Sequence, residues 1–293
     1  MALFLLTFKH KYDIIYNNLQ QIQRCFMETE SEKVIKKSFL SDLDRKLLNK
    51  DFPLQLINRD LLKYIALALM TLGHWQLTVY ALFHSKPLLM IVGALEFFAP
   101  PVFFFFISEG FHYTKSRSKY AIRLLIFAVI TQIPHSLTLA GGLTVHNLLL
   151  QWSVIMTLFL GLAALIVLHC DWKLPLRILA IAALMGISRL LNCEWAVSGI
   201  MIILLFDLLR EKPLIRLASY MALMYGILCV SLGSIPDTSL FLIYLLPEWA
   251  AGIVITFFYN GNKGHFPLFS KYFFYVWYPL HLFLQWLFQM IAK

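Results

Sequence analysis

Long, nearly continuous apolar runs repeat along this 293-residue chain and constrain its fold more than any other feature. The first run reads LLKYIALALMTLGHWQLTVYALF and begins at residue 61. A helix of about 20 residues, rising 1.5 Å per residue, crosses the ~30 Å hydrocarbon layer of a membrane. A transmembrane β-barrel needs short alternating segments instead. The sequence therefore predicts an all-α, polytopic helical membrane protein.

About nine transmembrane helices are expected in residues 61–293. They are placed at residues 61–83, 87–111, 119–139, 146–168, 175–191, 195–209, 213–232, 238–259 and 271–291. The sixth is short and could join the fifth as a broken helix. The Phe103–Phe106 run is expected in lipid-facing or interfacial packing rather than in contact with a ligand.

Residues 1–60 form a separate segment, because they hold ten basic and eight acidic residues. This mixture of charged and apolar residues predicts an amphiphilic helical extension in the cytoplasm or on the membrane surface. The plainer alternative is a peripheral extension without chemistry.

Lysine and arginine are unequally divided between the connections. With the N-terminus inside, the cytoplasmic connections hold 11 of these residues, against three on the other side and at the C-terminal end. Cytoplasmic loops carry such an excess, so the N-terminus is expected in the cytoplasm. The formal net charge of +9 is therefore explained by topology and membrane lipid, and no nucleic-acid partner is expected.

Four ionisable residues lie near the middle of their predicted spans: His74, Glu96, Glu248 and His281. Counted along each helix, all four fall at a depth of about 13–17 Å. Because an ionisable group there costs about 2.5–3.5 kcal/mol, it indicates a functional site by default. One interpretation is a proton-transfer site in which a histidine is the base and a carboxylate orients it. The other is a structural polar cluster that fixes helix packing.

A second group lies at the predicted cytoplasmic face. It comprises Lys63, Lys115, Arg117, Lys119, Arg123 and the turn YNGNKG, which contains Asn260 and Lys263. Basic side chains with free backbone amides suit a phosphorylated ligand. Such residues also commonly set topology and contact anionic lipid. No HExxH, GxSxG, Walker or GxGxxG motif is present, and no metal is expected.

Five blocks of the chain resemble, in order, those of the TraX family. They read LKYIALALMTLGHW, SEGFHYTKSRSKYAIRLLIFAVITQIP, EWAVSGIMIILLFDLLR, FFYNGNKG and KYFFYVWYPLHL. The resemblance spans residues 61–285, and its most specific part is YNGxxG combined with KYFFYxxYPxHL. Residues 1–60 lie outside it.

This family is similar to integral-membrane acyltransferases, which transfer an acetyl group from cytoplasmic acetyl-CoA to an acceptor at the membrane or beyond it. Its founding activity is N-terminal acetylation of conjugative pilin. The resemblance therefore implies a multi-pass protein of a bacterial inner membrane. The family's residues correspond here to Lys63, His74, Glu109-Gly110-Phe111, Arg123, Tyr259-Asn260-Gly261 and His281.

Two positions depart from the family pattern. The family usually has aspartate before the first-span histidine, where this chain has Gly73, and Gly-Arg where this chain has Glu96-Phe97. We hypothesise that the missing acid and base form an ion pair in relatives, because losing one partner alone would leave a buried charge. Glu96 would then supply the carboxylate near His74. Loss of activity is the competing explanation.

The resemblance and the polar groups together predict a membrane-bound acetyltransferase with acetyl-CoA as donor and no metal. The residues expected at the coenzyme are Lys63, Arg123, Asn260 and Lys263. His74 would deprotonate an acceptor amine or hydroxyl, oriented by Glu96 or Glu248. His281 would hydrogen-bond the thioester carbonyl or act as a second proton carrier.

Two alternatives remain open. The protein could be a non-enzymatic membrane carrier or assembly factor for pilin or an envelope precursor. Within the enzymes, an O-acetyltransferase acting on envelope glycan is as open as an N-acetyltransferase acting on a protein.

Overall fold

The computed structural model describes residues 30–264 and 267–291 of the chain. The chain divides into two units, Met1–Asn49 and Lys50–Lys293. The first unit contains helix α2 (Glu30–Asn49). Residues 1–29 of the predicted extension lie outside the described residues, and its place at a membrane surface stays a prediction.

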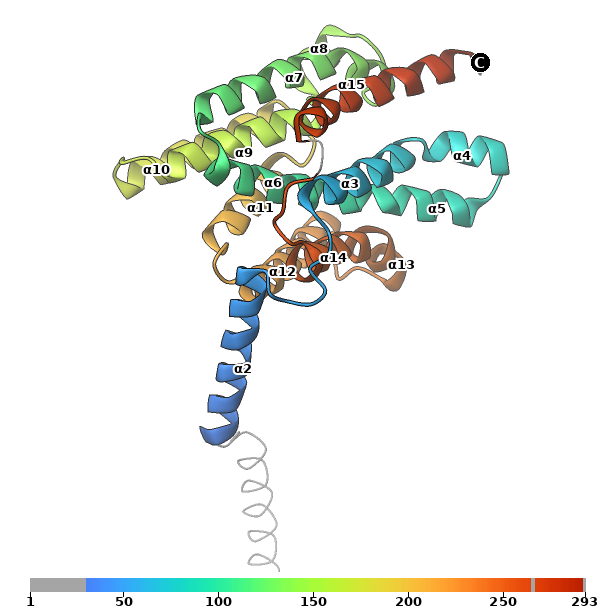
Figure 1. Ribbon diagram of the computed structural model, residues 1–293. Coiled ribbons are helices and arrows are strands. Elements are labelled where there is room, and N and C mark those ends of the chain that lie inside the picture. Colours follow the sequence, from blue (N-terminus) through green and yellow to red (C-terminus); the bar gives the residue numbers. More distant parts are fainter. Residues whose placement is uncertain (1–29, 265–266, 292–293) are drawn as a thin grey trace, which may run out of the picture. The chain divides into compact units, whose positions relative to one another are not determined.

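The described part of the second unit is helical apart from its connections and one isolated backbone pairing, between Ile57 and Tyr259. The all-α prediction is therefore confirmed. Figure 1 shows the helices, which are α3 (Arg59–His74), α4 (Gln76–Phe83), α5 (Lys86–Leu95), η1 (Glu96–Phe98), α6 (Ala99–Tyr113), α7 (Arg117–Thr138), α8 (Val145–Leu150), α9 (Val154–Leu168), α10 (Leu174–Leu190), α11 (Ala196–Leu208), α12 (Pro213–Leu232), α13 (Thr238–Leu240), η2 (Phe241–Leu245), α14 (Leu246–Ile253), η3 (Val254–Phe258) and α15 (Pro267–Ile291).

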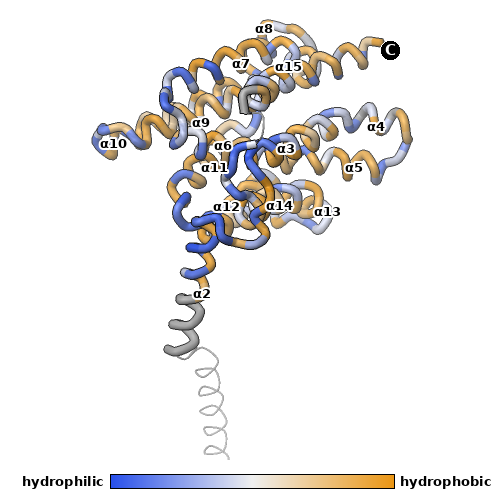
Figure 2. The backbone as a smooth tube through the Cα atoms, viewed as in Figure 1, coloured by the Kyte–Doolittle hydropathy of each residue, from blue (hydrophilic) through white to orange (hydrophobic). Residues whose placement is uncertain are grey.

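Five helical stretches in the described residues are long and apolar enough to cross a membrane. They are Lys86–Tyr113, Arg117–Thr138, Val145–Leu168, Pro213–Leu232 and Thr238–Phe258. Each matches a predicted span within a few residues. Figure 2 shows that the helices of the second unit are hydrophobic along most of their length, with hydrophilic residues gathered at the connections.

The predicted count of nine spans is not confirmed. The first predicted span is divided into α3 and α4, while α10 has 17 residues and α11 has 13. Helix α15 has 25 residues but is not among the five stretches that meet both criteria.

The division of the first predicted span falls at Trp75, directly after His74. The Trp75 amide donates to the carbonyls of Thr71 and Leu72, which ends α3, and α4 resumes with a bond from Val79 to Trp75. A helix end leaves carbonyl groups without intrahelical partners. The Gln285 side chain on α15 donates to the carbonyl of His74, so the end of α3 is also a point of contact between α3 and α15.

Helix α6 occupies the core of the second unit, where it packs against α3, α9, α11 and α14. Phe104, Phe105 and Phe106 on this helix are 0%, 7% and 5% exposed. The expectation of lipid-facing or interfacial packing is wrong for these three rings, because neighbouring helices surround α6. Helices α7 and α15 run side by side and complete this part of the bundle with α9 (Figure 1).

Candidate functional site

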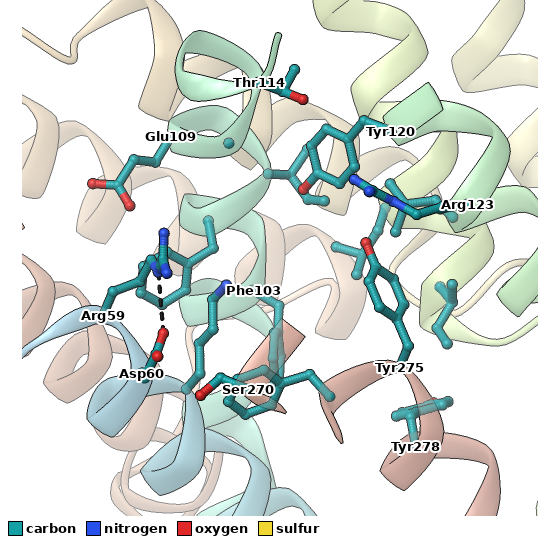
Figure 3. A pocket seen from close by; sticks show the side chains of 18 of the residues that line it. Arg59, Asp60, Phe103, Glu109, Thr114, Tyr120, Arg123, Ser270, Tyr275 and Tyr278 are labelled. Atoms are coloured by element: carbon teal, nitrogen blue, oxygen red, sulfur yellow. Dashed lines mark hydrogen bonds and ion pairs between the residues drawn. The ribbon is translucent and has the colours of Figure 1, made fainter. Parts of the chain in front are cut away.

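A cavity of about 810 Å³ lies where α3, α7 and α15 begin and α6 ends (Figure 3). Its size is typical of sites for small organic ligands, which run from about 300 to 1,000 Å³. Basic side chains outnumber acidic ones in its lining: Arg59, Lys63, Lys115, Arg123 and Lys263 stand against Asp60 and Glu109. The cavity therefore favours an anionic ligand at this end of the bundle.

Lys63 and Arg123 are the two predicted binding residues that lie within helices lining the cavity. The Lys63 Nζ atom lies 4.6 Å from the centroid of the Phe106 ring and 5.6 Å from that of Phe274. The Arg123 guanidinium lies 5.7 Å from the Tyr120 ring, and its buried Nε atom has no hydrogen-bond partner among the described residues. A cation and an unpartnered N–H donor beside one cavity suit phosphate oxygens.

The turn YNGNKG closes one side of this region through backbone bonds. The amide of Asn260 donates to the carbonyl of Ile57 over 3.0 Å, and the amide of Arg59 donates to that of Asn262 over 2.9 Å. Gly261 has φ +76°, a conformation that side chains rarely adopt. The Asn260 Oδ1 atom accepts from the Asn262 amide and so supports the turn.

Asn260 is not among the residues that line the cavity, whereas Lys263 is. Of the predicted coenzyme residues, the structure therefore brings Lys63, Arg123 and Lys263 to one cavity. It gives Asn260 a place in the turn beside it.

Tyr259, the first residue of the turn, connects it to α6. Its hydroxyl donates to Glu109 and lies 2.8 Å and 2.7 Å from the two carboxylate oxygens. Lys50 lies 5.0 Å from the Tyr259 ring centroid, and burial lowers the pKa of its ammonium group. The Glu109 carboxylate acts electrostatically on both Lys50 and Lys63, and so favours the charged form of each lysine.

His74 and His281 meet, although they lie 207 residues apart in sequence. The Nδ1 atom of His74 is 2.9 Å from the Nε2 atom of His281, and the rings stack with their centroids 5.2 Å apart. His281 Nδ1 lies 3.0 Å from the carbonyl oxygen of Trp277, which can only accept. His281 therefore carries its proton on Nδ1 and accepts at Nε2 from His74. This leaves the lone pair of His74 at Nε2.

Glu194, between α10 and α11, is the carboxylate of this cluster that sequence reasoning missed. It accepts from His135 Nε2 over 3.1 Å and from the Val154 amide over 2.9 Å. Burial opposes its charge, but the hydrogen bond and positive charge of His135 outweigh burial and hold the pKa of Glu194 below its usual value. Its carboxylate acts electrostatically on His74 and His281. The signal was the acid in NCEWAV, between two short apolar runs.

The floor of the cavity adjoins this cluster. Tyr278, which lines the cavity, places its ring 5.3 Å from that of His281 and its hydroxyl 3.5 Å from Glu194. Met70, one helical turn before His74 on α3, and Val154 also line the cavity. A ligand that fills the cavity from its basic end would therefore reach the residues that surround the histidine pair.

Glu96 lies against Gly73, the residue before His74. A Cβ atom at position 73 would lie 2.3 Å from the Cβ of Glu96, so the two positions are in direct contact. No hydrogen bond from Glu96 to His74 is found among the described residues, and His281 is the partner of His74. Phe97 packs edge-on against Tyr244 instead, with ring centroids 5.0 Å apart. Position 96, rather than 97, faces position 73 in this chain.

Glu248 lies on α14, away from these contacts. It is 4% exposed, and its Oε2 atom has no hydrogen-bond partner among the described residues. Its backbone carbonyl accepts from the Tyr220 hydroxyl of α12 over 3.2 Å. No hydrogen bond of the described residues joins it to His74 or His281, so the structure does not bring this predicted residue to the pair.

Several apolar helices surrounding a basic cavity and a histidine pair define the class: a multi-pass helical membrane protein with a basic cavity inside its bundle. Residues 58–289 match the family model described as TraX protein, and the chain belongs to this family. The resemblance inferred from the sequence is thereby confirmed.

The chain is also similar to a probable fimbrial assembly protein, FimC of serogroup H1, from Dichelobacter nodosus. The two are 30% identical over 237 residues, which cover 75% of this chain and 91% of that protein. No solved structure matches the chain.

Proposed function

We propose that this protein is an integral-membrane acetyltransferase that uses acetyl-CoA and acetylates an amine or a hydroxyl, such as the N-terminus of a pilin-like protein. The observation that carries the proposal is the cavity that is basic at one end and adjoins the His74–His281 pair at its floor. Membership of the TraX family supports it.

The cavity residues fit a donor of this kind. Its phosphates and the basic lining are complementary in charge, and the buried Arg123 Nε atom is a donor that finds no acceptor in the described part of the chain. The aromatic rings of Phe106 and Phe274 flank Lys63 and make cation–π contacts with its ammonium group. This positive charge would lie beside the ligand. When bound, acetyl-CoA would supply an acyl group activated as a thioester.

His74 is the proposed general base. Its Nε2 lone pair takes the proton of the acceptor amine or hydroxyl as that group bonds to the thioester carbonyl carbon. The carbon–sulfur bond then breaks, and His74 returns the proton to the leaving thiolate. His281 holds the His74 ring through the Nδ1–Nε2 bond, and the charge of Glu194 stabilises the imidazolium formed in between.

The proposed location is the inner membrane of a bacterium, with the N-terminus and the basic end of the cavity on the cytoplasmic side. The lysines and arginines of the connections support this orientation, since Lys115 and Lys263 line the same end of the cavity. Acetyl-CoA would then enter from the compartment that contains it.

The test uses the full chain in detergent or liposomes with acetyl-CoA and a peptide acceptor, and measures the free thiol released and the mass of the acceptor. The His74→Gln variant should lose about 10²–10⁴-fold in turnover while still inserting in the membrane. His146→Gln, at an exposed position on α8, is the matched control and should leave turnover unchanged. Activity of His74→Gln within threefold of the parent protein would refute the assignment.

The second candidate is a membrane assembly factor for a pilus or fimbria without transferase activity, favoured by the printed name of the similar FimC protein. Coenzyme dependence separates the two functions. If the protein is the enzyme, acetyl-CoA should raise its melting temperature, and the protein should release free thiol from acetyl-CoA. An assembly factor should show neither response, yet its deletion should reduce surface pili.

A further inference from the structure

We propose that His112, His169 and Asp207 form a binding site for a divalent transition-metal ion of the zinc class, at the end of the bundle where α6, α9 and α11 end. The expectation from sequence was that the protein holds no metal. These three residues form no short motif, because they are widely separated in the chain: His112 and Asp207 lie on α6 and α11, and His169 directly follows α9.

The ligand atoms of the three residues converge. The Nε2 atom of His112 is 2.6 Å from Asp207 Oδ1, and the Nε2 atom of His169 is 2.7 Å from Asp207 Oδ2. One nitrogen from each ring and one carboxylate oxygen lie within 4.8 Å of one another. Ligands held 2.0–2.1 Å from a tetrahedral zinc ion are about 3.3 Å apart, so small side-chain rotations admit the ion.

Two imidazoles and one carboxylate are a typical donor set for zinc and related ions, with water in the remaining position. Each Nε2–H group donates to Asp207 in this structure, so metal binding would move the ring proton to Nδ1 and leave the Nε2 lone pair for the ion. Asp207 supplies the negative charge and is 4% exposed. The side chains of His112 and His169 are 22% and 39% exposed, which leaves a route for an ion from solvent.

The site would act on the geometry of the cavity rather than on its chemistry. His112 lies in the last turn of α6, between Gly110 and Tyr113, which both line the cavity. Its ring is held by Asp207 of α11 and lies 5.7 Å from the His169 ring after α9. A bound ion would therefore tie the cavity wall to two other helices, and its removal would loosen that wall.

The experiment measures zinc in the full chain, purified in detergent through a tag without histidine. About one zinc ion per chain is expected, and a chelator should lower the melting temperature by about 5 °C or more, with recovery when zinc is added back. Cobalt substitution should give the absorption bands of a four-coordinate ion. These readouts do not depend on acetyl transfer, so they stand or fall separately from the proposed function.

Two variants test the ligands. Asp207→Asn preserves the shape of the side chain but removes its charge, and His169→Gln changes a half-exposed ring. Each should bind zinc at least tenfold more weakly, while His146→Gln keeps the parent affinity. Zinc binding unaltered in both variants, or a parent protein that takes up no zinc and does not respond to the chelator, would overturn the proposal. The cluster would then be a hydrogen-bonded tie between helix ends.

Discussion

Replacing Gly73 by alanine tests whether close contact between α3 and η1 sets the position of His74. The added Cβ atom would lie 2.3 Å from the Cβ and 3.1 Å from the Cα of Glu96. Rotation of the Glu96 side chain moves neither atom, so the backbones must separate by more than about 1 Å to restore ordinary carbon contacts. Overpacking of this kind costs about 1–3 kcal/mol.

The expected result is a melting temperature about 2–12 °C lower in detergent, from roughly 2–4 °C per kcal/mol. Because His74 follows Gly73 directly, turnover in the proposed acetyl transfer should also fall, by about 10²-fold if the imidazole moves by 1 Å. Gly226→Ala is the control, because nothing lies within 4 Å of a Cβ atom at that helical position. That variant should be neutral or slightly stabilised.

Adding Glu96→Gly removes the clashing Cβ atom and should recover part of the loss. A coupling of about 1 kcal/mol or more between the two positions is expected in a double-mutant cycle. Two results would contradict this reasoning. One is a Gly73→Ala variant as stable as Gly226→Ala; the other is a double-mutant cycle in which the effects of Gly73→Ala and Glu96→Gly are additive. Either would show that contact between positions 73 and 96 does not set the position of His74.

Three further substitutions probe the cavity and its floor. Glu194→Gln should lower the melting temperature, because hydrogen bonds to a charged group contribute about 1.5–3 kcal/mol, and should reduce kcat with little effect on KM; an unchanged kcat would remove Glu194 from the mechanism. Tyr259→Phe deprives the Glu109 carboxylate of its hydroxyl donor and should cost about 1–3 kcal/mol in thermal or denaturant unfolding, so unaltered stability would contradict the role given to this bond. Lys63→Met should raise KM for acetyl-CoA about tenfold, whereas Lys86→Met, at an exposed position on α5, should not; equal effects in a saturation assay would place the phosphates elsewhere.

The departures at positions 73 and 96 have a physical connection in this structure. An aspartate at position 73, as the family usually has, would put its side chain into the space that Glu96 occupies. The contact joins positions 73 and 96, whereas the hypothesised ion pair of relatives would join positions 73 and 97, and Phe97 packs against Tyr244 here, so that ion pair stays a prediction. The contact of Gly73 with Glu96 also supplies a reason other than loss of activity for the unusual pair.

The sequence by itself determined the helical class and most of the span positions. Apolar runs of 20 or more residues leave the backbone no alternative to helices in lipid, so Arg117–Thr138 and Pro213–Leu232 were found almost to the residue. The sequence also identified His74 and His281, because an ionisable residue inside an apolar run is visible without any knowledge of packing.

Only the tertiary structure decided which polar groups are partners. The pairing of His74 with His281, the contact of Glu194 with His135 and the convergence of His112 and His169 on Asp207 all join residues far apart in the chain. The hydrophobic pattern of a sequence indicates which side of a helix is apolar, but it does not indicate which other helix packs against that side. Glu248 shows the difference, since it has the same predicted depth as the histidines, but its helix α14 packs against η1, α6 and α12 rather than against the histidine-bearing helices α3 and α15.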